Sequence, residues 1–138
     1  MEKQKITIES LIAADLHKVW DFWIAPEHII NWNFASEDWH CPKAENELKE
    51  DGKFKYTMEA RNGSFSFDFA GIYTKVVQDE QIDFVTEDNR KVSVVFEHKD
   101  GKTRVIETFE AETENNPETQ KKGWQAILDN FKKYVEEN

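Results

Sequence analysis

The chain has little of several features that would mark it as a secreted or membrane protein. Cys41 is the single cysteine among 138 residues, which excludes an internal disulfide and is typical of a reducing compartment. No apolar run approaches the length of a membrane span. The N-terminal stretch MEKQKITIES has no apolar segment of the kind that a secretory signal requires. Together these absences predict a cytoplasmic protein.

Basic residues are also scarce relative to acidic ones. The sequence has 28 acidic and 18 basic residues, which gives a formal net charge of −10. A surface of this sign repels nucleic-acid phosphates and anionic lipids. We therefore expect neither nucleic acid nor a membrane as a partner.

Motifs of the common enzyme and metal-binding classes are missing as well. The sequence contains no P-loop, no G-x-G-x-x-G and no G-x-S-x-G, so NTPase, dinucleotide-binding and hydrolase functions have no support. The four histidines His17, His28, His40 and His98 are too widely spaced for a typical zinc site, and we predict no metal and no cofactor. Cys41 directly follows His40, and neighbouring side chains on extended backbone point apart. We therefore predict a buried, unreactive thiol and no catalytic residue.

Aromatic side chains, in contrast, are abundant and lie on segments of regular period. The chain has ten Phe, five Trp and three Tyr, and 38% of its residues are hydrophobic, enough for one globular domain over residues 1–138. Asn116 and Pro117 are typical of the start of a helix. Over residues 117–137 the apolar positions recur in steps of three and four, which predicts an α-helix about 30 Å long. Its apolar stripe comprises Trp124, Ile127, Leu128, Phe131, Tyr134 and Val135.

The preceding residues predict a sheet for this helix to lie on. Lys5–Ile12 alternates like a strand, Asp15 can cap a first helix, and Pro26 can open a second. Residues 33–42 read as an irregular, aromatic-rich segment. From residue 45 onward, alternating segments and two hairpin signals, Asn62-Gly63 and Asp100-Gly101, predict five or six antiparallel strands. A twisted sheet of this kind curls around the helix, and bulky side chains can leave an apolar cavity between them.

Two segments carry a resemblance to a known family. HKVWDFWIAPEHIINW, residues 17–32, resembles the signature of the SRPBCC (START-like, or birch-pollen-allergen-like) superfamily. It is most similar to the branch named for the C-terminal domain of the activator of the heat-shock-protein-ninety ATPase. Val19-Trp20, Pro26-Glu27-His28 and Trp32 fall on that branch's Val-Trp, Pro-Glu and Trp positions. Gly123-Trp124, followed by Ile127-Leu128 and Phe131, resembles its ending.

The resemblance implies an α+β helix-grip fold, in which a curved antiparallel sheet wraps around the long C-terminal helix. It also implies a hydrophobic cavity that binds a small apolar molecule without catalysis. Two alternatives stay open within the family. One is an interaction module that regulates a chaperone or another protein, and the other is an enzyme of cyclase or hydrolase type.

The side chains predicted to bind the ligand come from the loop, the sheet and the final helix. We expect Trp32, Phe34 and Trp39 at the mouth, Phe67 and Phe69 on the floor, and Trp124 at one end, beside a Gly123 that approaches other backbone. The full predicted set is Trp32, Phe34, Trp39, Met58, Phe67, Phe69, Phe84, Glu107, Phe109, Trp124, Ile127 and Leu128.

Glu107 is the one charged residue in this set, and its orientation is open from sequence. Period-two alternation puts it on one face with Val105 and Phe109, while Ile106 lies on the other. If the first face is inward, a carboxyl enters the cavity, where it could hold a ligand or act as an acid with a raised pKa. If Ile106 is inward, Glu107 is solvated. An enzyme would need an acid–base pair, for which Glu107 with Tyr56, Tyr73 or His40 is the available candidate.

Overall fold

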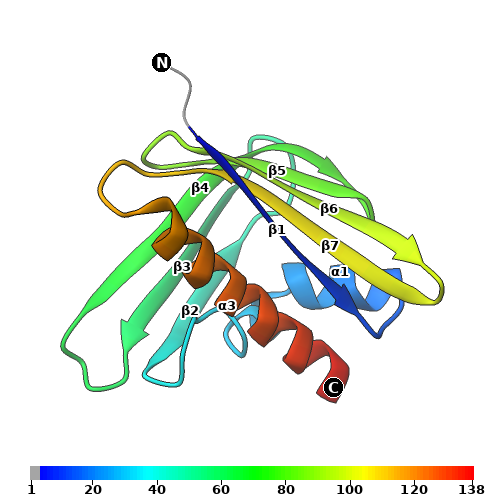
Figure 1. The fold of residues 1–138 in the computed structure, drawn as a ribbon, viewed down its shortest axis with the longest axis horizontal. Coiled ribbons are helices and arrows are strands. Elements are labelled where there is room, and N and C mark those ends of the chain that lie inside the picture. Colours follow the sequence, from blue (N-terminus) through cyan, green and yellow to red (C-terminus); the bar gives the residue numbers. More distant parts are fainter. Residues whose placement is uncertain (1–3) are drawn as a thin grey trace.

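A curled seven-stranded antiparallel sheet partly encloses one long helix, which gives the α+β helix-grip architecture that the sequence predicts (Figure 1). The computed structural model describes residues 4–138, so the first three residues of the N-terminal stretch considered for a secretory signal lie outside it. Along the chain the elements are β1 (Lys5–Ile12), α1 (Leu16–Ile24), α2 (Pro26–Ile29), β2 (Trp39–Asn46), β3 (Lys53–Ala60), β4 (Ser66–Val77), β5 (Gln81–Thr86), β6 (Lys91–Lys99), β7 (Lys102–Glu110) and α3 (Pro117–Glu137).

The order of strands across the sheet is β1-β7-β6-β5-β4-β3-β2. Strands β2 to β7 therefore form a meander, while β1 joins its far edge by pairing with β7, with Lys5 opposite Glu110. The hairpin between β6 and β7 turns at Asp100 and Gly101, which have φ values of 50° and 78°. Asp and Gly tolerate this left-handed region, which explains the predicted turn.

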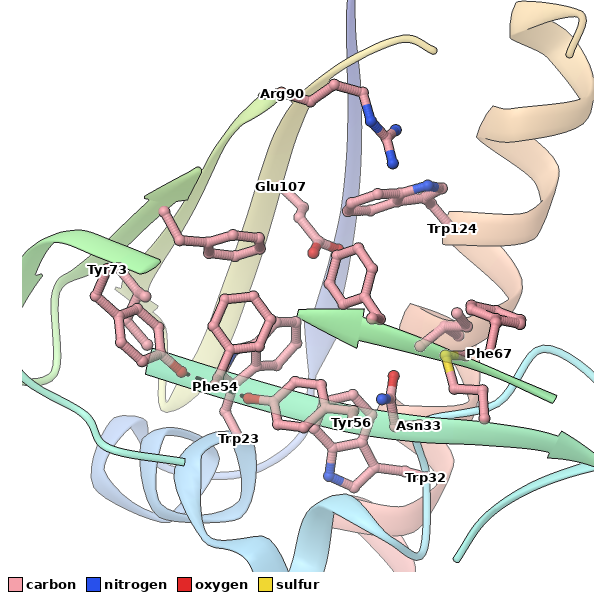
Figure 2. A pocket seen from close by; sticks show the side chains of 15 residues that line it. Trp23, Trp32, Asn33, Phe54, Tyr56, Phe67, Tyr73, Arg90, Glu107 and Trp124 are labelled. Carbon is pink, nitrogen blue, oxygen red and sulfur yellow. Dashed lines mark hydrogen bonds between the residues drawn. The ribbon is translucent and has the colours of Figure 1, made fainter. Parts of the chain in front are cut away.

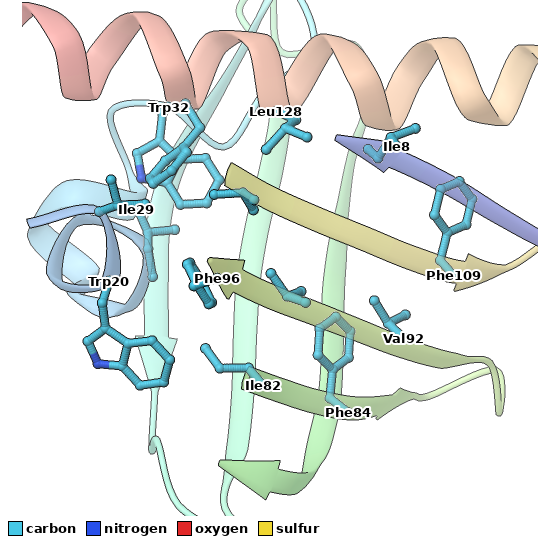
Figure 3. Packing of buried hydrophobic residues seen from close by; sticks show 14 of the residues in the cluster. Ile8, Trp20, Ile29, Trp32, Ile82, Phe84, Val92, Phe96, Phe109 and Leu128 are labelled. Atoms are coloured by element: carbon cyan, nitrogen blue, oxygen red, sulfur yellow. The ribbon is translucent and has the colours of Figure 1, made fainter. Parts of the chain in front are cut away.

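Helix α3 crosses the concave side of the sheet and packs most closely on β1 (Figure 1). Asn116 begins the helix as predicted, because its side chain accepts a hydrogen bond from the Glu118 amide at 2.7 Å. Leu128, Phe131 and Val135 are fully buried, and Leu128 points from α3 toward the sheet (Figure 3). The core thus lies between the C-terminal half of α3, β1, β7, β6 and α1.

Two local predictions are wrong. Residues 39–42, predicted to be irregular, form the first half of strand β2, which has a register shift between His40 and Lys43. Pro42 donates no hydrogen bond and normally argues against a strand, but an edge position tolerates it. Gly123 does not approach other backbone, because a Cβ placed there would meet nothing within 4 Å.

None of the helices formed by residues 4–138 combines the length and the apolar character needed to cross a membrane.

Candidate functional site: an aromatic cavity under helix α3

A cavity of about 220 Å³ lies between the concave face of the sheet and the N-terminal half of α3. Nine of its fifteen lining side chains are aromatic, and they come from α1, the segment after α2, β3, β4, β5 and α3 (Figure 2). We call this space the inner cavity. Its rings contact one another in series, with centroid distances of 4.8 Å for Phe54–Phe84, 6.1 Å for Phe69–Phe84 and 5.9 Å for Phe69–Trp124.

The structure brings eight of the twelve predicted residues to this cavity. Five come from the sheet, namely Met58, Phe67, Phe69, Phe84 and Glu107. The other three, Trp32, Trp124 and Ile127, come from the segment after α2 and from α3. Segments that are far apart in the sequence therefore meet at one place, although ligand binding by these residues stays a prediction.

The other four predicted residues lie outside the inner cavity. Phe109 and Leu128 are core residues, 0% and 1% exposed. The ring of Trp124 stacks over Phe109 at a centroid distance of 3.9 Å and separates Phe109 from the cavity. Phe34 is half-buried. Trp39 lies in an outer space, described next, because β2 carries it to the edge of the sheet.

The outer space, which we call the vestibule, adjoins the inner cavity and has a volume of about 370 Å³. Trp39, Gly123 and Gln120 are among the residues that line it alone. Five side chains line both spaces, namely Met58, Phe67, Arg90, Trp124 and Ile127. The vestibule therefore provides a route from solvent to the inner cavity, with these side chains at the junction.

Glu107 points inward, which decides the question that the sequence left open. The residue is only 7% exposed, and Val105 and Phe109 beside it on the same face of β7 are fully buried. Its carboxyl lies in the inner cavity near Trp124 (Figure 2). Within residues 4–138 no side-chain hydrogen bond or ion pair satisfies this carboxyl. Burial raises the pKa of Glu107 from 4.5 to about 8, because the charged form is poorly solvated there.

Asn33 is a second polar group in the cavity, and sequence reasoning missed it. The side chain is 7% exposed and lines the inner cavity. Its buried Nδ2 makes no hydrogen bond of normal geometry among residues 4–138, although the Asn33 side chain lies near enough to the Cys41 thiol to lower the pKa of that thiol against the larger effect of burial. Asn33 follows Trp32 in a segment where apolar residues show no regular period, so no pattern in the sequence indicated where its side chain points. An unpaired buried amide donor is costly, and a ligand with an acceptor atom would satisfy it.

The phenols of Tyr56 and Tyr73 also line the cavity, and both lie away from Arg90 (Figure 2). Their hydroxyl oxygens lie 3.5 Å apart, and Tyr73 donates to Asn46 Oδ1 at 2.5 Å. Burial raises the pKa of Tyr56 well above its ordinary value and that of Tyr73 to about 12. Both phenols are therefore neutral at physiological pH.

The structure connects none of the acid–base pairs considered from the sequence. No hydrogen bond joins Glu107 to Tyr56 or Tyr73 within residues 4–138, and His40 lies on β2 with its Nε2 3.0 Å from Glu59 Oε1. Cys41 is 3% exposed, and burial raises the pKa of its thiol, which suits an inert residue. Over the described part of the chain, no three His, Cys, Asp or Glu side chains gather into a possible metal site.

Comparisons with known proteins agree with this architecture. The model of a family described as Activator of Hsp90 ATPase homolog 1-like protein matches residues 13–136. The chain is similar to the solution structure of an AHSA1-like protein from Aeromonas hydrophila, with 45% identity, a TM-score of 0.92, and 97% of this chain and 93% of that chain covered. None of the curated proteins compared with the chain matches it.

Two further solved structures show how widely the fold is shared. A protein from Cytophaga hutchinsonii is 46% identical over 97% of this chain and 93% of its own, with a TM-score of 0.83. A protein from Chromobacterium violaceum is 20% identical over 96% of this chain and 98% of its own, with a TM-score of 0.86. The second likeness concerns the fold alone.

Proposed function

Because the chain belongs to the Activator of Hsp90 ATPase homolog 1-like family, we propose that it is a non-catalytic cytoplasmic protein that binds a small apolar molecule in the inner cavity. The observation that carries this proposal is the aromatic cavity of about 220 Å³ between the sheet and α3. A packed interior normally leaves few spaces larger than a water molecule. A dry engineered cavity of about 150 Å³ already takes up benzene.

The lining supplies both affinity and orientation. Each Å² of apolar ligand surface removed from water contributes roughly 25 cal/mol, and the rings of Phe54, Phe69 and Phe84 offer such a surface. Asn33 and Glu107 add two polar groups to this wall, an amide whose Nδ2 makes no hydrogen bond of normal geometry in the described chain and a buried carboxyl. Small-molecule sites typically have a small number of polar groups in an otherwise apolar wall, and these groups fix the orientation of the ligand.

The proposal is tested with a neutral two-ring fluorescent probe, 2-naphthol, and two variants at one position. Gly123 lines the vestibule and has open space where a Cβ would lie. Gly123→Trp should therefore fold normally but obstruct the route, and stopped-flow fluorescence should record slower association of the probe. Gly123→Ala is the matched control and should associate at the wild-type rate.

Native mass spectrometry of gently purified protein provides a second measurement, since it detects a small molecule that co-purifies. Fluorescence of the probe that is unchanged by the protein, together with the absence of any co-purifying molecule, would contradict the proposal. Equal association rates for both Gly123 variants would place the binding site elsewhere.

A second candidate function, interaction with a protein partner, is favoured by three neighbouring aromatic residues at the β3–β4 end of the sheet. Phe65 and Phe67 are 54% and 44% exposed, and Trp39 lies 6.0 and 5.8 Å from them between ring centroids. The acidic, exposed residues 37–38 precede Trp39 in the sequence, and the exposed Arg61 lies beside them, with its Nε donating to the carbonyl of residue 37 at 2.7 Å. An apolar centre with charged residues beside it suits a partner protein with a complementary charged rim.

The family description suggests a chaperone of the Hsp90 type as the partner to test. Phe65 belongs to the exposed aromatic group but does not line the inner cavity, so Phe65→Ser separates the two functions. Under the second candidate, this variant loses stimulation of the chaperone's ATPase while it keeps probe binding. If wild-type protein leaves the ATPase rate unchanged, this candidate is wrong.

A further inference from the structure

Glu107 is the feature of the cavity that apolar ligand binding alone does not explain. A buried carboxyl without a partner is destabilising, and Leu or Gln would fill the position at lower cost. Its neighbours across the sheet, Ile8 on β1 and Val94 on β6, are apolar and buried. Nothing in the packing of β7 therefore requires a carboxyl here.

Aromatic rings form most of the wall of the space that this carboxyl faces. The indole of Trp124 is held in place by stacking on Phe109 at 3.9 Å with an interplanar angle of 9°, and Phe69 meets it edge-on at 85°. Ring faces attract cations through their quadrupole, most strongly those of Trp and Tyr. A carboxyl combined with several aromatic rings offers both of the interactions that an ammonium group uses.

The other ionisable groups at the cavity do not compete for this role. Tyr56 and Tyr73 are neutral phenols, as described above. Arg90 carries a positive charge at the junction with the vestibule, but its Nε donates to Asp88 Oδ2 at 2.8 Å and its Nη1 donates to the Glu110 carbonyl at 3.4 Å. No ion pair joins Arg90 to Glu107 in residues 4–138. The net charge of −10 favours the approach of a cation.

We propose that the inner cavity selects small aromatic amines, with the ammonium group bound by the Glu107 carboxylate and the apolar body held among the aromatic rings. This inference rests on the proposed function and specifies the chemical class of its ligand. A volume of about 220 Å³ limits the body to one or two rings, by comparison with the benzene-binding cavity above.

The test compares ligands of one skeleton in wild-type protein and two variants. Phenethylamine, phenylethanol and phenylacetate have the same apolar body and carry a cation, a neutral hydroxyl and an anion. Isothermal titration calorimetry should show the highest affinity for the amine, a lower affinity for the alcohol and the lowest for the carboxylate. Glu107→Gln should reduce the affinity for the amine by about tenfold to a hundredfold, the range of a charged hydrogen bond, while the affinity for the alcohol changes little. The control is Glu97→Gln, which removes the same charge from an exposed position on β6.

The pH dependence distinguishes an ion pair from simple packing. Glu107 is mostly protonated below its pKa of about 8, so binding of the amine at neutral pH must release a proton and should strengthen as the pH rises to 8. Affinity for phenethylamine should fall again once the amine loses its proton, at a pH of about 10.4 if its pKa is that of a lysine side chain. Phenyltrimethylammonium cannot lose a proton, and its affinity should stay constant above pH 8.

The outcomes separate this inference from the proposed function. If neither the alcohol nor the neutral fluorescent probe binds, the cavity is not a ligand site and both proposals fail. If both bind but the amine has no advantage, or Glu107→Gln weakens the amine and the alcohol equally, the selection of amines is wrong and the proposed function stands. Intact folding of Glu107→Gln is checked by its circular dichroism spectrum.

Discussion

The two halves of helix α3 lie on the same sheet but meet it differently. In the C-terminal half, Leu128, Phe131 and Val135 are 1%, 0% and 0% exposed, and Phe131 packs edge-on against Trp23 and Trp32 at 4.9 and 4.7 Å. In the N-terminal half, Trp124 and Ile127 are half-buried and border the inner cavity. The C-terminal half of α3 thus belongs to a close-packed core, while its N-terminal half borders the inner cavity.

This difference teaches that stability and binding can be divided along a single element. A close-packed region carries most of the folding energy, because every removed atom leaves a void that its neighbours cannot fill. A region that already borders empty space has fewer contacts to lose. The hollow half can therefore accommodate groups that are costly for folding, such as Glu107 and Asn33.

The strongest test of the comparison uses two neighbours in sequence. Leu128→Ala should reduce the free energy of unfolding by roughly 3–5 kcal/mol, the range for a fully buried leucine. Ile127→Ala should cost roughly 1–2 kcal/mol, since one side of this residue already faces the cavity. Urea denaturation of both variants measures the difference.

Lys133→Ala is the control for this pair, because Lys133 is exposed on the outer face of α3 and should change stability by less than about 0.5 kcal/mol. Equal losses for Leu128→Ala and Ile127→Ala would mean that the two halves of α3 do not differ.

A second prediction concerns the pH dependence of stability. The pKa of Glu107 is raised from 4.5 to about 8 in the folded protein, so folded protein binds more protons than unfolded protein between these values. The group is neutral in both states below pH 4.5, so its ionisation has no effect on stability there. Its cost grows as the pH rises from 4.5 to 8, at about 1.4 kcal/mol per pKa unit, and reaches a few kcal/mol as an order of magnitude.

Glu107→Gln removes this cost and should be clearly more stable than wild type at pH 9, with a much smaller advantage at pH 5. Thermal or urea unfolding at the two pH values gives the measurement, and Glu97→Gln again controls for net charge. A difference between wild type and Glu107→Gln that does not vary with pH would show that the carboxyl is solvated.

The smallest predicted effect is a gain in stability from substitution of Gly123. This residue lies inside α3 with open space around the position of a Cβ. Gly123→Ala should therefore stabilise the protein by about 0.5–1 kcal/mol, since alanine loses less backbone entropy in a helix. A loss of stability measured by urea denaturation would indicate that the vestibule is more tightly packed than described.

The sequence predicted the two elements that frame the fold with correct bounds. Lys5–Ile12 and Pro117–Glu137 have strong periods and clear end signals, and the structure confirms both. Strand β2 was missed because Pro42 and irregular polarity hide an edge strand, whose outer side makes no ladder hydrogen bonds.

The site was harder to predict than the fold. The period of apolar residues shows on which face of a helix or strand a side chain lies, but not how deeply that side chain is buried. Phe109 shares its face of β7 with Glu107, and only the tertiary position of Trp124 places it in the core. Leu128 likewise shares its stripe with Ile127. Asn33 lies in a loop, where no period exists to indicate its direction.

The register shift in β2 has a consequence for contacts between molecules. A sheet that ends in a regular strand can be extended by a strand of another copy, which leads to aggregation. Here one edge strand, β1, is packed against α3. The other, β2, carries Pro42 without an N–H within its irregular stretch, followed by exposed Lys43 and Glu45, which form an ion pair at 3.1 Å. Both edges therefore resist strand addition, and a sheet rich in aromatic residues can remain dispersed at high concentration.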